Sequence, residues 1–175
     1  EAFNRKFVDE NSIRLYMVSN PKKITVKNLS ITTVEVSNHP VKEMGKRKID
    51  VDGNFYISGE DAQSIKEGEQ IRLLGLGNIL ITKQGEEIEG EYVKDGDIKS
   101  IPKIQWVSQK TAHKIKMIIP KILFIGEDFN EDSLEEMDVY CEPHYLQLKD
   151  GEEIQFIRFG YCRKDSQNQA IFTHK

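Results

Sequence analysis

The fold class is decided by residues 70–93, which read QIRLLGLGNILITKQGEEIEGEYV. QIRLLGL, ILITK and EIEGEYV are short apolar or alternating runs, and such runs are the pattern of β-strands. Gly75, Gly77 and the Gln84-Gly85 pair fall between these runs, where turns are expected. The segment therefore predicts three consecutive strands.

Short runs of the same kind fill most of the remaining chain. They are IRLYMV, ITVKNL, TTVEVSN, KRKIDV and FYIS before this segment, and KIQWVS, HKIKMII, YLQLK and EIQFIRFGYCRK after it. Two short helices are expected, one that begins at Ser58 and ends near Gly68, and one helical turn around 132–137. The chain is thus predicted to be an all-β protein whose strands close into a sandwich or barrel.

Composition describes a folded protein, with 38% hydrophobic and 31% charged residues in 175. This length suffices for one domain or for two small β-barrels that share an interface. No apolar run approaches the roughly 18 to 20 residues of a membrane-spanning helix, and the opening EAFNRKFVDE lacks the apolar core of a signal peptide. We therefore expect a cytoplasmic protein in which Cys141 and Cys162 are reduced, partly buried thiols.

Charge is distributed unevenly along the chain, although the net charge is only -4. Residues 98–126 contain six lysines and no acidic residue, whereas residues 127–142 contain eight carboxylates and no basic residue. Indiscriminate coating of nucleic acid requires a large positive field, which this net charge does not supply. One face is predicted to meet phosphate, and the acidic segment is predicted to be a solvated loop that faces away from it.

Sequence motifs of catalysis are absent. There is no P-loop, GxSxG, HExxH or GxGxxG motif, and the acidic segment lacks the alternating ligands and central glycine of a calcium loop. The histidines His39, His113, His144 and His174 show no metal-ligand spacing. No catalytic residue, metal site or cofactor is therefore expected within this chain.

Several strings in fixed order resemble the carboxy-terminal anticodon-binding region of archaeal-type glutamyl-tRNA synthetases, which belong to class I. They are Asn4-Arg5-Lys6, Arg14 with Asn20-Pro21, His39-Pro40 with Gly45 and Arg47, ISGEDA from Ile57, PKIQWV from Pro102, and QFIR from Gln155. The resemblance covers essentially the whole chain. It implies a parent enzyme that attaches glutamate to tRNA with ATP and magnesium, and a fragment that is itself not catalytic and carries no cofactor.

The resemblance also implies an architecture and a partner. The fold would be two antiparallel β-barrels with one or two short helices, a proximal barrel made of residues 1–55 plus 119–175 and a distal barrel inserted at 56–118. The partner would be tRNA-Glu, and in some members of the family also tRNA-Gln. We expect the protein to be a monomer.

Three residues are expected to contact the anticodon because they match the motifs of the family: Arg14, Gln155 and Arg158. Arginine offers a rigid fork of donors and glutamine offers a donor and an acceptor, which suits the edges of unstacked bases. The family string QFER is QFIR here, with Ile157 in place of the glutamate. On a flat strand Gln155 and Arg158 would point to opposite faces, so a bulge or a strong twist is needed if both contact one RNA loop.

Other basic residues are weaker candidates for contacts with the phosphates of the anticodon loop, where charge matters more than position. They are Lys46, Arg47, Arg72, Lys103, Lys110, Lys114 and Lys116. Trp106 is expected in the core, because it lies in an apolar strand.

Three other functions stay open on the sequence. The chain resembles the same region of a glutaminyl-tRNA synthetase, although PKIQWV and the FTHK ending favour the glutamyl enzyme. A free-standing ribosomal-type β-barrel and a β-barrel interaction module without an RNA partner are the other two.

Overall fold

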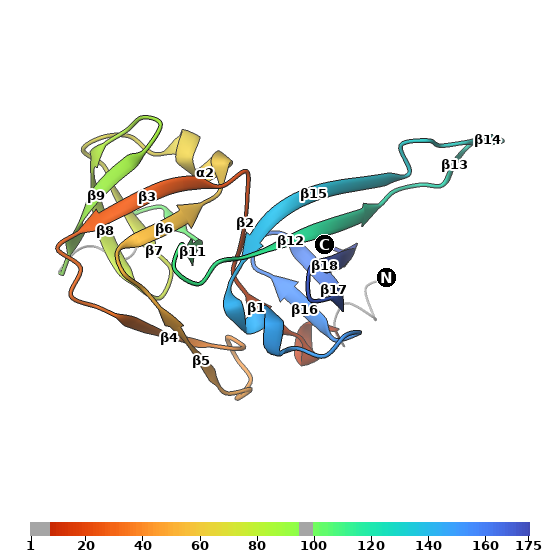
Figure 1. Cartoon of the computed structure of the whole chain (residues 1–175), viewed down its shortest axis with the longest axis horizontal. Helices are drawn as coiled ribbons and strands as arrows, with labels where there is room; N and C mark the ends of the chain where they lie inside the picture. Colours follow the sequence, from red (N-terminus) through yellow and green to blue (C-terminus); the bar gives the residue numbers. More distant parts are fainter. Residues whose placement is uncertain (1–7, 95–99) are drawn as a thin grey trace.

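Two curved β-sheets dominate the computed structural model, which describes residues 8–94 and 100–175 (Figure 1). The first sheet has the order β1-β16-β17-β18-β12-β15-β2. Its strands are β1 (Ile13–Leu15), β2 (Met17–Ser19), β12 (His113–Pro120), β15 (Leu134–Cys141), β16 (Glu153–Phe156), β17 (Gly160–Ser166) and β18 (Gln169–His174).

The second sheet has the order β10-β7-β8-β9-β3-β6-β11. Its strands are β3 (Lys22–Lys27), β6 (Asn54–Ile57), β7 (Gln70–Leu73), β8 (Gly77–Lys83), β9 (Ile88–Val93), β10 (Lys103–Ile104) and β11 (Trp106–Ser108). The opening segment of the sequence analysis supplies β7, β8 and β9, as its alternation predicts.

Each sheet curls because its two edge strands follow each other in the chain. Only Tyr16 separates β1 from β2, and only Gln105 separates β10 from β11. The chain thus leaves one edge of a sheet and joins the opposite edge within one residue, which gives two barrel-like sheets and confirms the all-β prediction.

The expectation that both barrels are purely antiparallel is wrong. Four strand pairs among the described residues are parallel: β1 with β16, β3 with β9, β7 with β10, and β12 with β18. Parallel neighbours need a crossover connection rather than a hairpin, so these pairs join segments far apart in sequence. The alternation within a strand carries no information about such a partner.

Sheet membership changes after β2 and again after β11, so β3 belongs to the second sheet. The division of the chain into a proximal barrel of residues 1–55 plus 119–175 and a distal barrel of residues 56–118 stays a prediction. A separate hairpin, β4 (Thr33–Ser37) with β5 (Lys46–Asp50), spans the region between the two sheets. Its buried Val34 and Ile49 pack with the core of the second sheet.

Two apolar clusters form the core, one for each sheet. Trp106 is fully buried in the cluster of the second sheet, as predicted, and its Nε1 donates to the carbonyl oxygen of Leu74 at 2.8 Å. Cys141 and Cys162 are free thiols buried in the cluster of the first sheet. Burial raises the pKa of Cys162 to about 12, so this thiol stays protonated and inert.

Helices are short. Ser58 caps the N-terminus of α2 (Gly59–Ser64), as predicted. The helix ends before the expected Gly68, because the backbone of Ile65 is already extended. The predicted strand YLQLK does not form, because its first three residues belong to a 3-10 helix, η1 (Pro143–Gln147), in which proline fixes the first turn. The Asn4-Arg5-Lys6 string and the turn signal at residues 95–97 lie outside the described residues.

The helical turn expected at 132–137 is wrong, because β15 begins at Leu134. Most of the acidic segment is exposed to solvent, as expected, but residues 134–141 are not a loop, because they form β15. It pairs with β12 over eight residues, from His113 opposite Cys141 to Pro120 opposite Leu134. The two strands extend from the body as an arm that ends in β13 (Phe124–Ile125) and β14 (Asp128–Phe129) (Figure 1).

Candidate nucleic-acid interface

Arg14 and Gln155 occupy paired positions on neighbouring parallel strands, β1 and β16. The register continues across the sheet, from Gln155 to Tyr161 on β17 and from Tyr161 to His174 on β18. Residues in register point to the same face, and the neighbours Leu15 and Phe156 are fully buried on the opposite face. The sheet therefore places Arg14 and Gln155 side by side on its outer face.

Asp9 holds two side chains of this face, those of Arg14 and Tyr161, in place. Its Oδ1 accepts hydrogen bonds from Arg14 Nη2 at 2.9 Å and from the hydroxyl of Tyr161 at 2.5 Å. The hydrogen bond from Tyr161 is the largest cause that lowers the pKa of Asp9 below 3.8, and the nearby charge of Arg14 lowers it further. Asp9 is therefore ionised at neutral pH and holds Arg14 through one of its three nitrogens.

Two polar atoms on this face are buried without a partner in the part of the chain that the structure describes. They are Nε of Arg14 and Nε2 of His174. The ring of His174 stacks on Tyr161 with centroids 4.6 Å apart. The ring of Tyr161 is buried, so Arg14, Gln155 and the half-buried ring of His174 are the parts of this row that an unstacked base could meet.

Arg158 lies in a turn, and the expectation of one continuous strand at 153–164 is wrong. β16 ends at Phe156, which pairs with Gly160, and residues 157–159 form the hairpin loop. Arg158 has a φ of 64°, in the left-handed region that non-glycine residues seldom occupy. Its Nη1 donates to both carboxylate oxygens of Asp61 in α2, at 3.0 and 2.9 Å.

This turn separates the three expected anticodon contacts into two places. Arg158 borders a cavity of about 510 Å³ whose lining contains neither Arg14 nor Gln155. Ile157, which replaces the glutamate of the family string, packs against the core cluster of the second sheet. The hairpin therefore does not do what the sequence required of a bulge, because it turns Arg158 away from the strand face of Gln155.

The basic residues of β5 differ sharply from one another. Lys46 is exposed and pairs with Glu35 at 2.8 Å, whereas Arg47 is buried and pairs with Glu142. The guanidinium of Arg47 also donates to the carbonyl oxygen of Ser37. Arg47 thus holds the β4–β5 hairpin to the end of β15, and its burial removes it from contact with phosphate.

The lysines of β12 are paired with acidic residues of β15. Lys114 Nζ lies 2.7 Å from Asp138, and Lys116 Nζ lies 2.6 Å from Glu136. Parts of the lysine-rich and acid-rich segments are therefore the two strands of one arm, in which Lys114, Lys116 and Lys121 pair with three carboxylates of β15. The four carboxylates at 127–132 have no ion pair within the described residues, so the arm stays acidic.

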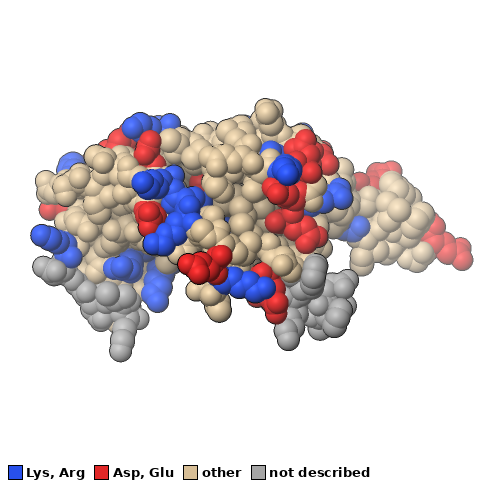
Figure 2. All heavy atoms as spheres, turned by 90° about the horizontal axis from the view of Figure 1, so that it is seen from below, with Lys and Arg blue, Asp and Glu red and all other residues tan. Residues whose placement is uncertain are grey.

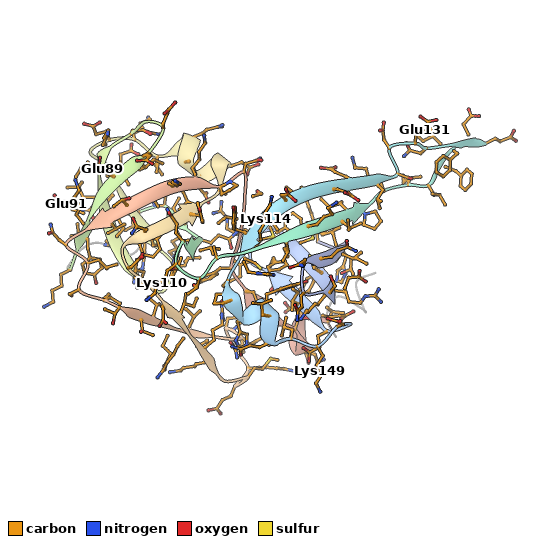
Figure 3. The ribbon with its side chains drawn as sticks, in the orientation of Figure 1. Glu89, Glu91, Lys110, Lys114, Glu131 and Lys149 are labelled. Atoms are coloured by element: carbon orange, nitrogen blue, oxygen red, sulfur yellow. The ribbon has the colours of Figure 1, made fainter. Side chains whose placement is uncertain are left out.

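The remaining candidates lie near the second sheet. Arg72 on β7 donates to Asn78 at 2.8 Å, Lys103 on β10 is exposed, and Lys110 is at the turn before β12. Figure 3 shows Lys110 in this turn, with Lys114 further along the arm. Figure 2 shows Lys and Arg side chains gathered on one half of the lower face, with acidic side chains prominent on the other half.

Sequence reasoning missed Asp9, Asp61 and Gln105. Asp61 gave a signal, since a carboxylate in the first turn of a predicted helix is common, but its contact with Arg158 spans 97 residues. Gln105 lies inside an apolar string and is 6% exposed. Only the closure of the second sheet identifies it as the residue that joins the two edges.

Comparison with known protein families covers both halves of this structure. Residues 12–100 match the family described as tRNA synthetases class I (E and Q), anti-codon binding domain. Residues 103–165 match a second model with the same description. The chain belongs to this family of anticodon-binding domains.

Similar proteins are ligases of archaea. The chain is 71% identical over 175 residues to a glutamate--tRNA ligase of Nitrosopumilus maritimus, and 47% identical over 174 residues to that of Cenarchaeum symbiosum. A glutamate--tRNA ligase of Korarchaeum cryptofilum is 29% identical over 174 residues. The match covers 98 to 100% of this chain but only 29 to 31% of these relatives, so the chain spans about a third of their length.

Within residues 8–94 and 100–175, no group of three or more His, Cys, Asp or Glu residues is arranged to hold a metal ion. No helix in these ranges is long and apolar enough to cross a membrane.

Proposed function

We propose that this chain recognises the anticodon loop of tRNA-Glu, and that the part of the ligase beyond it attaches glutamate with ATP and magnesium. Membership of the anticodon-binding family and 71% identity to a glutamate--tRNA ligase support the proposal. The structural observation that carries it is the pairing of Arg14 with Gln155 in register on the outer face of the first sheet.

In this proposal Arg14 and Gln155 contact one unstacked base. Asp9 holds Nη2 of Arg14, so Nη1 remains to donate to a base edge, whereas Nε is buried. Arginine held at one end loses less conformational freedom when it binds, because its fork is already oriented. Gln155 adds a donor and an acceptor next to it.

In the second part of the proposal, exposed lysines contact the phosphates of the anticodon loop. Lys103 and Lys110 are exposed and have no ion pair in the described part of the chain, whereas Lys46, Lys114 and Lys116 each face a carboxylate. Lys103 and Lys110 are therefore the best-placed of the basic candidates. The protein is proposed to act as a monomer.

The closest alternative is the same role in a glutaminyl-tRNA synthetase. Filter binding with transcripts of tRNA-Glu, tRNA-Gln and an unrelated tRNA separates the alternatives. Preference for tRNA-Glu supports the proposal, and preference for tRNA-Gln supports the glutaminyl enzyme. Equal binding of all three contradicts a role in anticodon recognition.

A further inference from the structure

His39 lies in the loop between β4 and β5, and only 6% of its surface is exposed. A buried imidazole needs a partner for each ring nitrogen, because a polar atom without a partner away from water costs free energy. Both nitrogens of His39 have partners, and these partners lie in two different segments of the chain. The ring therefore connects the two segments.

Nδ1 of His39 accepts hydrogen bonds from two backbone N–H groups of its own loop. They are those of Lys42 at 2.9 Å and Val41 at 3.2 Å. Pro40 has no N–H, so these are the first two backbone donors that follow His39 in the chain. Because two donors point at Nδ1, this nitrogen carries no hydrogen, and the hydrogen of the neutral ring is on Nε2.

Nε2 of His39 lies 2.9 Å from the backbone carbonyl oxygen of Asp9 and donates to it. Asp9 is the residue whose carboxylate holds Arg14. A second hydrogen bond joins the same two segments, from the backbone N–H of Arg14 to the carbonyl oxygen of Asn38 at 2.8 Å. The loop after β4 is thus attached at both Asp9 and Arg14, the two partners of the ion pair on the outer face of the first sheet.

Asp9 is held at two points by two parts of the fold. Tyr161 on β17 donates to its carboxylate, whereas His39 donates to its backbone oxygen. The side chains of Arg14 and Asp9 are 25% and 42% exposed, so solvent competes with the ion pair between them. Ordering such a pair costs conformational entropy, and this cost is smaller where the backbone that carries the pair is already fixed.

The remaining contact between the two segments is exposed. Lys42 pairs with Glu10 at 3.2 Å, with side chains 44% and 48% exposed, and solvent screens a pair of this kind. His39 is therefore the buried side chain that links the loop to Asp9.

We propose that His39 is a positioning residue for anticodon recognition, which orients the guanidinium of Arg14 by fixing the backbone of Asp9. Its buried ring is not available to RNA, so it acts through Asp9 and Arg14. A contact residue discriminates best when residues behind it hold its geometry. This inference rests on the proposed function, because it requires that Arg14 contact an anticodon base.

Two substitutions separate the two roles of the ring. In His39→Asn, the amide oxygen takes the place of Nδ1 and still accepts from the loop, but the shorter side chain does not reach Asp9. In His39→Gln, the amide nitrogen takes the place of Nε2 and still donates to Asp9, but the acceptor beside the loop is lost. His39→Gln is thus the matched control, and thermal unfolding should show that both variants fold.

Binding is measured with the 175-residue chain and anticodon stem-loops of tRNA-Glu in which each anticodon base is replaced singly. His39→Asn should reduce discrimination at the position that Arg14→Ala flattens, by about two- to tenfold, the range that one hydrogen bond supports. His39→Gln should keep the wild-type ranking. A second measurement needs no RNA, since nitrogen NMR should show faster rotation of the Arg14 guanidinium about its Nε–Cζ bond in His39→Asn than in His39→Gln or the wild type.

The inference is overturned if His39→Asn keeps the wild-type ranking, weakens every stem-loop equally, or loses no more discrimination than His39→Gln. Equal rotation of the Arg14 guanidinium in the two variants overturns it as well. If Arg14→Ala flattens one position and His39→Asn leaves that position intact, only the role of His39 fails. If Arg14→Ala itself changes no preference, the proposed base contact of Arg14 fails, and the role of His39 fails with it.

Discussion

Arg47 and Glu142 form an ion pair in which each side chain exposes only 1% of its surface, and Nη2 lies 2.7 Å from Oε1. Glu142 also accepts a hydrogen bond from the backbone N–H of Tyr16, the residue that joins β1 to β2. The pair therefore ties the β4–β5 hairpin to the seam of the first sheet. Its role is to hold the β4–β5 hairpin against the first sheet.

Arg47→Met should destabilise the protein by about 3 to 5 kcal/mol, because it leaves Glu142 charged, buried and without its cation. Lys46→Met is the control on the same strand, where the exposed pair with Glu35 is screened by solvent and its loss should change stability little. Urea unfolding of both variants measures the difference. Equal losses in the two would contradict the structural role of Arg47.

Tyr161→Phe should raise the pKa of Asp9 toward its usual 3.8, since the hydroxyl of Tyr161 is the main cause of the lowered value. A carboxyl group whose pKa is lower in the folded state than in the unfolded state stabilises the fold at any pH above its unfolded-state pKa. This contribution to stability is lost as the pH falls through the folded-state pKa. The contribution of Asp9 is thus present above about pH 4 and is lost below it. An NMR titration of the Asp9 carboxyl carbon in both proteins gives the two values, and identical values would refute this network.

Lys110→Ala should weaken binding of all tRNAs alike and reduce the slope of log K against log salt by roughly one unit. Lys114→Ala should reduce it by less, because Asp138 already balances the charge of Lys114 at 2.7 Å. Binding titrations at several salt concentrations compare the two variants. A larger change for Lys114 would place the arm rather than the turn at the phosphates.

Removing two charges at the end of the arm, with Glu131→Gln and Asp132→Asn, should change tRNA affinity little. Figure 3 shows Glu131 at the far end of the arm, well away from Lys110, and carboxylates repel phosphates only within about a Debye length, roughly 8 to 10 Å at physiological salt. A gain in affinity of tenfold or more for the double variant would instead place the arm at the RNA.

Strand alternation predicts much of this fold, because local patterns are visible wherever one face of a strand is buried. It succeeds for β7 to β9 and fails for β15, whose exposed carboxylates resemble a loop. The lysines that balance those carboxylates lie about 20 residues earlier in the chain, as Lys116 and Glu136 do. A pairing of this kind appears only when β12 and β15 are placed side by side.

The candidate site, like the fold, could be predicted only in part from the sequence. The resemblance to the family supplied Arg14, Gln155 and Arg158, and the parallel register of β1 with β16 then brought the first two together. Ile157 and Phe159 continue the alternation of apolar and polar residues beyond β16, so the sequence does not reveal the hairpin loop around Arg158. Asp9 and Asp61, the carboxylates that hold the two arginines, are set by tertiary contacts that no local pattern reports.

The most direct test of the central claim measures how Arg14→Ala and Gln155→Ala change discrimination among anticodons. Each should cost about 1 to 3 kcal/mol of binding to tRNA-Glu and flatten the ranking of anticodon variants, because each removes contacts with a base edge. Lys110→Ala in the same series should weaken every variant equally. If Arg14→Ala and Gln155→Ala fold normally and leave the ranking of anticodons unchanged, the outer face of the first sheet does not read the anticodon.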